Sequence, residues 1–342
     1  MNKITDELGK IINPLYMVGG SVRDELLGKT PKDYDYATSL TPDEIEAAIK
    51  GAGRRAYTVG KRFGTIGVVI DGQMAEITTF RKEEYTEGSR KPAVEYVTDI
   101  TEDLSRRDFT INAMAIRYST KGYKLIDPFG GQEDLKNKVI RCVGNPKARF
   151  KEDPLRILRA ARFASQLEFT VEENTDKKAK EVSHRILTVS KERWVMELDK
   201  ILMTTKPSVG LDFLMKNKLF SFMIPELAIQ DGYDQNSPYH NMELWEHTLT
   251  VVDNVPAEIN LRWAALLHDI GKPFVRTNRP DRSNYIKHDM LGAEIVKKYA
   301  SYLRWSNDRK EKVSDLVLTH MLETNPMRKA DYIGKKLEEE VF

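Results

Sequence analysis

Two aspartates separated by one residue, Asp33 and Asp35, follow a glycine-rich turn near the start of the chain. In an extended strand alternate side chains point to the same face, so both carboxylates could hold divalent cations together. Gly19 and Gly20 leave backbone N–H groups accessible to phosphate oxygens, and a helix beginning near Ser21 would favour an anion at its N-terminus. Each feature alone is typical of an ordinary turn or a solvated loop. Together they predict a site for a metal-bound nucleoside triphosphate.

A third carboxylate and a nearby arginine extend this prediction. Glu76 lies in the alternating run 74–80, which predicts another strand, and an acid between apolar neighbours needs a partner that a cation would supply. Arg23, just after the glycine turn, could reach triphosphate oxygens. An exposed salt bridge with Asp24 or Glu25 is the alternative.

The segment 106–112 contains two arginines, an acid and an amide directly before an apolar run. Asp108 and Asn112 are four residues apart, so a helical turn would place them on one face. The alternative is that Asp108 caps a helix and Asn112 is solvated.

Basic residues are concentrated between Lys136 and Arg162, although the net charge of the chain is only +2. Such a surface attracts phosphate-rich ligands with a strong dependence on salt. A solvated helical face without a partner is the alternative.

Six collinear motifs between about residue 13 and about residue 205 resemble the class II tRNA nucleotidyltransferases. This family comprises the CCA-adding enzymes and the bacterial poly(A) polymerases. The motifs are Val18–Asp24, Asp33–Asp35, Thr78–Arg81, Arg106–Ala115, Asp127–Gly131 and Glu152–Ala164.

The resemblance implies an α/β head of the polymerase-β type, with a mixed sheet and helices, followed by an all-α neck and an all-α HD-type domain. It implies template-independent addition of C, C and A to the tRNA 3′ end from CTP and ATP, with Mg²⁺ held in the head. Asp33, Asp35 and Glu76 take the catalytic positions. The motif with Arg107, Asp108 and Asn112 then handles ribose and phosphates, and the glycine turn with Ser21 and Arg23 binds the nucleotide.

Base selection is expected at the start of the neck. Glu152, Asp153 and Arg156 fall within little more than one helical turn, where Asp153 and Arg156 could offer an acceptor and a forked donor that imitate a Watson–Crick edge. The resemblance implies this amino-acid template role, with Glu152 orienting the arginine, and adds Arg159 to the nucleotide-binding residues. From physics alone, Asp153 before Pro154 favours a helix N-cap.

The C-terminal third holds five of the six histidines, His240, His247, His268, His288 and His320. An apolar helix face that ends in His268-Asp269 can present an imidazole and a carboxylate to one metal.

These residues resemble an HD phosphohydrolase, with His247, His268 and Asp269 matching its pattern. His288 and His320 could serve a second metal, and the later aspartate is Asp315 or Asp331. The donor set suits Mg, Mn, Ni or Fe. A helical body that mostly holds RNA is the alternative.

The polar segment 81–93 is expected to form a mobile loop. In the family a loop here is needed to switch from C to A addition, so its presence argues against an enzyme that adds only CC. The remaining alternatives are an enzyme that adds only the terminal A, a poly(A) polymerase, and an HD metal-dependent phosphohydrolase with a degenerate head. The chain ends at Phe342, so we expect little room for a helical tail on the tRNA elbow or for the longer basic C-terminus of poly(A) polymerases.

Composition agrees with a multidomain enzyme: the chain has 342 residues, of which 40% are hydrophobic and 31% charged. The pattern along the chain predicts three pieces, over 1–137, 138–235 and 236–342, and the resemblance implies that these are the head, the helical neck and the HD-type domain. No apolar run is long enough to span a bilayer and no signal peptide is evident, so we expect a cytoplasmic protein of unspecified oligomeric state. A single cysteine, Cys142, excludes an internal disulfide.

Overall fold

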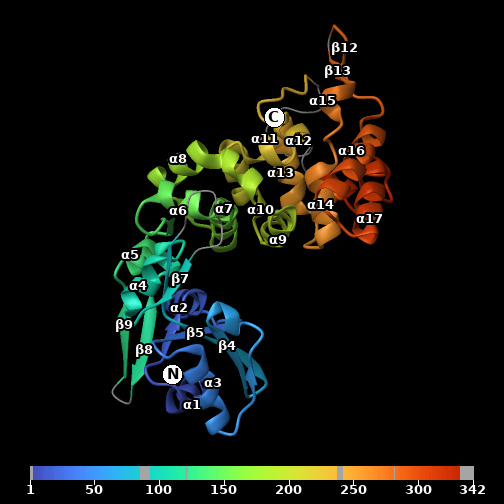
Figure 1. The fold of residues 1–342 in the computed structure, drawn as a ribbon. Coiled ribbons are helices and arrows are strands. Elements are labelled where there is room, and N and C mark those ends of the chain that lie inside the picture. The colour runs from blue at the N-terminus through green and yellow to red at the C-terminus, as the bar shows by residue number, and fades with distance from the viewer. Residues whose placement is uncertain (1–2, 85–92, 120–121, 237–241, 281, 332–342) are drawn as a thin grey trace. The chain divides into compact units, whose positions relative to one another are not determined.

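The computed structural model describes residues 3–84, 93–119, 122–236, 242–280 and 282–331 (Figure 1). The chain divides into two compact units, Met1–Asp153 and Pro154–Phe342. The three-domain boundaries expected from the sequence stay predictions.

A seven-stranded mixed sheet forms the centre of the first unit, with the strand order β3-β4-β5-β2-β1-β8-β9. Strands β2 and β5 run parallel, whereas the other neighbours in the sheet are antiparallel. The strands are β1 Tyr16–Val18, β2 Tyr34–Thr38, β3 Ala56–Tyr57, β4 Thr65–Ile70, β5 Gln73–Thr79, β8 Ala115–Ser119 and β9 Gly122–Ile126. The mixed α/β head expected from the sequence is confirmed.

Short helices accompany this sheet (Figure 1). They are α1 Lys3–Ile11, α2 Gly20–Leu26, α3 Pro42–Gly51, η1 Lys61–Phe63, α4 Ile100–Ser105, η2 Thr110–Asn112, α5 Gly131–Lys136 and α6 Pro146–Glu152, with a short strand β10 Val139–Ile140 before α6. Helix α3 begins where it does because Thr41 and Glu44 form a capping box and Pro42 occupies the first turn.

One face of the sheet is buried and the other is open around the acidic residues. Along β5 the even-numbered Met74 and Glu76 are exposed, whereas Ala75 and Ile77 are fully buried. On the face that carries the acids, Val18, Ala37 and Ala115 belong to a buried cluster with Phe80 and Leu104, so this face is open only around the carboxylates. The period-two pattern of the sequence therefore fixes which face of β5 carries the carboxylate.

The segment predicted as a loop over 81–93 is in part a two-stranded antiparallel sheet, so that prediction was wrong at both ends. β6 Arg81–Glu84 pairs with β7 Ala93–Tyr96, with Arg81 opposite Tyr96, and residues 85–92 lie outside the described part of the chain. An ion pair of 2.8 Å joins Lys82 Nζ to Glu95 Oε2 across the strands. Polar composition alone did not distinguish a loop from this pair of strands, because cross-strand pairs of opposite charge stabilise a two-stranded sheet without an apolar pattern.

The second unit is helical (Figure 1). Its elements are α7 Leu155–Leu167, β11 Thr170–Val171, α8 Glu173–Val182, η3 Ser183–Thr188, α9 Lys191–Leu202, α10 Pro207–Lys216, α11 Leu219–Met223, α12 Pro225–Ala228, α13 Leu244–Asn254, α14 Ile259–Leu267, α15 Lys272–Val275, β12 Thr277–Asn278, β13 Ser283–Asn284, α16 His288–Tyr302 and α17 Asn307–Leu318.

Apolar residues at helical spacing build the core of this unit, as the sequence predicts. In α9 the predicted stripe from Trp194 to Leu202 is fully buried, and the Trp194 indole N–H donates to the Ile186 carbonyl at 3.1 Å. Helices α16 and α17 pack side by side. Across the described residues no helix combines the length and apolar character needed to cross a membrane.

Candidate active site and a second candidate metal centre

Asp35 and Glu76 are direct partners in the parallel pairing of β2 and β5. Paired residues on neighbouring strands point to the same face, so both carboxylates extend from the open side of the sheet. Asp33 precedes β2 by one residue, and all three acids are exposed. The tertiary pairing thus brings a residue 41 positions away in the sequence beside Asp35.

Mutual repulsion is the electrostatic consequence of this arrangement. Partial desolvation raises the pKa of Asp35 above its ordinary value, and the charges of Glu76 and Asp33 raise it further, while Arg107 opposes them. A cation between such groups relieves the repulsion. Carboxylates that share one face, as Asp35 and Glu76 do, are a donor set that suits a hard divalent ion.

The glycine turn closes against this acidic face. Gly19 has a φ of 71°, and a Cβ there would lie 2.9 Å from Arg107 Nη1 and 3.9 Å from Asp35 Oδ2, so glycine is required. Ser21, buried just after Gly20, donates its hydroxyl to the Val18 carbonyl at 2.9 Å and accepts from the Asp35 amide at 3.2 Å. The turn and the strand that carries Asp35 are therefore held together by one hydroxyl.

Arg23 is buried and connects α2 to the 106–112 segment. Its Nη1 donates to Asn112 Oδ1 at 2.8 Å, and its Nη2 lies 2.8 Å from Asp24 Oδ1. Asn112 Nδ2 in turn donates to Asp108 Oδ1 at 3.2 Å. The alternative ion pair with Asp24 is present but buried, and contact of Arg23 with phosphate stays a prediction.

Asp108 and Asn112 meet as expected, although the helix between them is the short 3₁₀ helix η2. The Asp108 carboxylate also accepts from the Phe109 amide at 2.8 Å, a local bond of the capping type.

Asp103 is a site residue that the sequence analysis missed. It is 1% exposed and lies 2.9 Å from Arg106 Nη2 and 3.1 Å from Arg107 Nη2. Burial would raise the pKa of Asp103, but the charges of Arg107 and Arg106 outweigh it and hold the pKa below the ordinary value. The spacing of three and four residues in this segment was the pattern that could have revealed it.

The expected single helical turn through Glu152, Asp153 and Arg156 does not exist. Helix α6 ends at Glu152, Asp153 is extended, and α7 begins at Leu155, with Pro154 rather than Asp153 at the N-cap position. Proline disfavours a helical conformation in the residue before it, which explains the break. Asp153 and Arg156 also fall in different units, so their pairing stays a prediction.

Two of these selection residues have neighbours within their own helix. Glu152 Oε1 lies 2.7 Å from Arg149 Nη2 in the same helix. Arg156 is buried, and the half-buried Arg159 has its guanidinium carbon 5.5 Å from the centre of the Phe163 ring.

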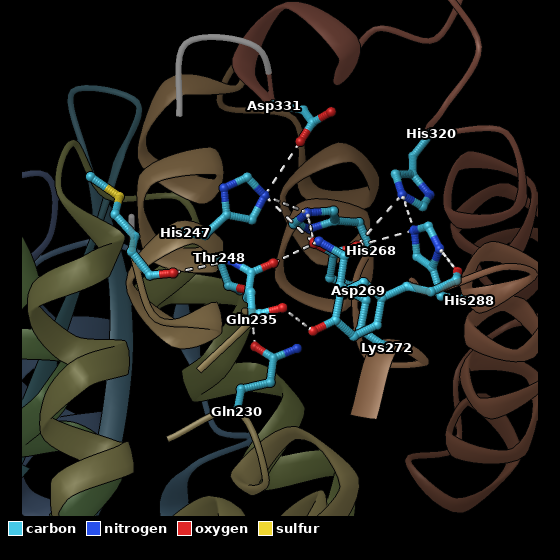
Figure 2. Close-up of polar contacts among 12 residues, drawn as sticks. Gln230, Gln235, His247, Thr248, His268, Asp269, Lys272, His288, His320 and Asp331 are labelled. Carbon is cyan, nitrogen blue, oxygen red and sulfur yellow. Dashed lines mark hydrogen bonds and ion pairs between the residues drawn. The ribbon is translucent and has the colours of Figure 1, made fainter. Parts of the chain in front are cut away.

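A second cluster lies in the C-terminal part of the second unit, where two histidine pairs surround one aspartate (Figure 2). His247 Nε2 and His268 Nε2 are 3.3 Å apart, and His288 Nε2 and His320 Nε2 are 3.1 Å apart. Asp269 Oδ2 lies 3.1 Å from His268 Nε2, and its Oδ1 lies 3.3 Å from His288 Nε2.

Of the two later aspartates, Asp331 belongs to this cluster, with Oδ1 3.3 Å from His247 Nε2. The described residues therefore contain two buried groups whose ligand atoms lie within 4.8 Å of one another: His247, His268 and Asp331, and Asp269, His288 and His320. His240 lies outside the described residues.

Backbone carbonyls fix the orientation of three of these imidazoles. The Nδ1 atoms of His268, His288 and His320 lie 2.8, 2.7 and 2.7 Å from carbonyl oxygens within their own turns. A neutral imidazole that donates from Nδ1 presents a lone pair at Nε2. Facing lone pairs repel unless a proton or a cation lies between them, which is the arrangement of a metal centre.

Asp269 sits between both groups and is fully ionised. Burial would raise its pKa, but electrostatic interaction and a hydrogen bond with the His268 ring, together with the Lys272 ammonium, hold it well below the ordinary value. Lys272 Nζ is 2.7 Å from Asp269 Oδ2 and 2.9 Å from Gln235 Oε1. Burial lowers the pKa of His320 to about 4, which keeps it neutral and able to bind a metal.

A cavity of about 420 Å³ opens beside the second cluster. Cationic side chains of Lys272, Arg282 and Lys287 line it together with the potential metal ligands His288 and His320. This combination suits an anionic substrate next to a metal.

Comparisons with known proteins agree with this architecture. Family models match three successive stretches: the poly A polymerase head domain over residues 15–141, the probable RNA and SrmB-binding site of polymerase A over 168–230, and the HD domain over 239–340. A CCA-adding enzyme of Geobacillus sp. (strain WCH70) is 36% identical over 330 residues, which cover 95% of this chain and 76% of that protein. The chain belongs to the CCA-adding enzyme family, the class II nucleotidyltransferases.

Other members of the CCA-adding enzyme family support the assignment. The enzyme of Bacillus velezensis is 38% identical over 275 residues, which cover 78% of this chain and 63% of that relative. The chain thus spans less than two thirds of this relative's length. The crystal structure of the Bacillus stearothermophilus CCA-adding enzyme in complex with CTP matches with a TM-score of 0.65 and 27% identity, covering 100% of this chain and 84% of that one.

Proposed function

We propose that this chain adds C, C and A to the 3′ end of tRNA from CTP and ATP by metal-assisted nucleotidyl transfer. The observation that carries the proposal is the register pairing of Asp35 with Glu76, beside Asp33 and the Gly19 turn, on the open face of the sheet. Nucleotidyl transfer needs acids that can share cations next to a surface that admits a triphosphate.

Asp33, Asp35 and Glu76 would hold Mg²⁺, which supplies charge neutralisation of the phosphates and lowers the pKa of the attacking 3′-hydroxyl. Through these ions Asp33 and Asp35 would orient the triphosphate. Glu76 would lie toward the 3′ end of the RNA primer. Arg107, held by Asp103 beside Gly19, places a fixed positive charge where the phosphates approach. Arg23 holds Asn112 and through it Asp108, which positions the segment assigned to the ribose.

Base selection is assigned to Asp153 and Arg156, with Glu152 and Arg159 around them. In the sequence these residues fall within the 138–235 neck. The arginine fork and the carboxylate can satisfy the exposed edges of C and A, whereas G and U have the opposite donor pattern.

Product length tests the proposal directly. Purified protein is incubated with Mg²⁺ and tRNA ending at the discriminator base, in C or in CC, with each nucleoside triphosphate separately and together. With CTP and ATP together, we expect three nucleotides to be added to the first RNA, two to the second and one to the third. Addition only to tRNA-CC would indicate an enzyme specific for the terminal A, and long products with ATP alone would indicate a poly(A) polymerase.

Two groups of buried potential metal ligands lie around Asp269, and they favour a second function. We propose that this HD-type domain, assigned to 236–342, hydrolyses phosphomonoesters or 2′,3′-cyclic phosphates at a divalent metal. The test is release of phosphate from p-nitrophenyl phosphate and hydrolysis of 2′,3′-cyclic AMP with Mg, Mn, Ni or Fe added. We expect hydrolysis that survives loss of Asp33 and disappears with His268→Ala. Absence of hydrolysis with every metal would leave the helical body as an RNA-holding element.

A further inference from the structure

A surface without an assigned role lies next to Glu76 on the open face of the first unit. One row of paired residues crosses the sheet there: Tyr57 with Gly67, Gly67 with Glu76, and Glu76 with Asp35. Paired residues share a face, so Tyr57 lies on the side of the sheet that carries the acids. With neighbouring strands about 4.8 Å apart, Tyr57 is about 10 Å from Glu76 along this row.

Gly67 has no side chain, and two apolar groups cover the space above it. A Cβ at Gly67 would lie 3.3 Å from Tyr57 Cβ and 3.2 Å from Met74 Sδ. Met74 is 46% exposed and Tyr57 is half-buried. The exposed Arg55 holds its guanidinium carbon 5.1 Å from the centre of the Tyr57 ring. We call Arg55, Tyr57 and Met74 the β3–β5 shelf.

The position of the shelf indicates which substrate it faces. The Gly19 turn and Arg107 approach Asp35 from the β1 side of the row, which is the side proposed for the triphosphate. The shelf lies on the other side, beyond Glu76. The attacking 3′-hydroxyl must enter opposite the departing pyrophosphate, so the RNA end approaches from the shelf side.

We infer that the β3–β5 shelf stacks the base of the 3′-terminal nucleotide of the RNA primer. This inference rests on the proposed nucleotidyltransferase activity. Across successive additions that base is first the discriminator base and then C, so a contact indifferent to base identity is needed. Aromatic, thioether and guanidinium surfaces stack on any base, and Arg55 adds a charge for the adjacent phosphate. Tyr57 is thus a positioning residue for the primer.

Kinetics with short acceptor-stem RNAs test the role of Tyr57. We expect Tyr57→Ala to raise the KM for RNA about tenfold, with the KM for CTP and the kcat at saturating RNA unchanged. Tyr57→Phe and Tyr57→Trp keep a ring and retain the wild-type KM, whereas Tyr57→Leu keeps the bulk and shares the defect. Tyr123→Ala is the matched control, because Tyr123 is 65% exposed on β9 at the opposite edge of the sheet.

A primer whose last nucleotide lacks its base makes the test specific. The wild-type enzyme should lose about tenfold in kcat/KM on this RNA, and Tyr57→Ala should lose no more than it has already lost. Equal penalties in both enzymes, or an unchanged RNA KM in Tyr57→Ala, would overturn the inference while the proposed function stands. A wild-type protein that incorporates no nucleotide would overturn the proposed function, and the inference with it.

Discussion

The two candidate metal sites differ in how completely the protein builds them. In the first unit Asp33, Asp35 and Glu76 are exposed on a sheet face and offer only carboxylates. In the second unit the ligand atoms are buried, lie within 4.8 Å of one another and are oriented by backbone carbonyls. The three head acids do not form such a compact group among the described residues.

This difference fits two ways of using a metal. An exposed carboxylate face leaves coordination positions for phosphate oxygens, so substrate and ion complete the site together. A buried histidine and carboxylate shell is already formed without substrate and can retain an ion by itself. We therefore expect the head to depend on free Mg²⁺ and the HD-type cluster to hold its metal tightly.

The largest expected effect is on the head acids. Asp35→Ala should lower nucleotide incorporation by about a thousandfold or more, because several kcal/mol of metal-mediated stabilisation is lost. Asp33→Ala should do the same, while tRNA binding and HD-type hydrolysis persist. Incorporation of labelled CTP and a tRNA filter-binding assay measure both properties. Asp71→Asn is the control, since Asp71 is a head carboxylate that pairs with exposed Lys3. Full activity of either alanine variant would refute the metal assignment.

Metal retention compares the two sites directly. After desalting without added metal, we expect the protein to retain divalent metal at the HD-type cluster and to regain incorporation only when Mg²⁺ is added. His268→Ala should lose the retained metal and the phosphate release, with nucleotide addition unchanged. His184→Ala is the control, because His184 is exposed on η3. Metal analysis by mass spectrometry gives the readout, and equal metal content in His268→Ala and the wild type would contradict the assignment.

Substitution of Asp103 tests whether its buried carboxylate stabilises the Arg106 and Arg107 side chains of the head. Asp103→Asn leaves Arg106 and Arg107 without their buried carboxylate, so we expect a loss of about 3–5 kcal/mol in the free energy of unfolding at pH 7 and a higher KM for nucleotide. Urea denaturation and steady-state kinetics measure the two effects. Asp6→Asn, which removes an exposed and solvent-screened pair with Lys10, should leave the free energy of unfolding nearly unchanged.

The stabilisation that the Asp103 carboxylate provides should decrease at low pH. The pKa of Asp103 is lowered in the folded state, so its stabilisation is fully present above the ordinary carboxyl pKa and disappears as the pH falls through the lower folded value. The stability difference between wild type and Asp103→Asn should therefore be constant near neutral pH and shrink below pH 3.8. A difference that grows on acidification would contradict the ionised pair.

The smallest expected effect concerns base choice. Arg156→Ala should raise incorporation of UTP and GTP relative to CTP and ATP by about tenfold, since one forked hydrogen-bonding pair discriminates by about 1–3 kcal/mol. Arg156→Lys keeps the charge but not the fork and should share the defect. Lys151→Ala, an exposed basic residue nearby, is the control. Unchanged rejection of UTP and GTP would count against the template role.

Local patterns predicted much of the fold and many of the acidic residues. The alternation around Glu76 depends on neighbours in the chain, and it appears in the structure as expected. The break at Asp153–Pro154 is also encoded in the local sequence. It was not predicted, because the surrounding residues have helical spacing. The pairing of β6 with β7 was not anticipated, because their polar composition resembles that of a loop, and the burial of Asp103 was not anticipated, because it also depends on contact with Arg81 of β6.

The sequence by itself determined the identity and spacing of the chemical groups: the two aspartates, the glycine turn, the paired histidine and aspartate, and the helical stripes. Only the tertiary structure decided which of them meet. Strand register placed Glu76 beside Asp35, and packing of the helices brought Asp331 rather than Asp315 to His247. The physical reason is that periodicity depends on backbone geometry within a few residues, whereas register and helix packing are set by burying the apolar surface of the whole unit.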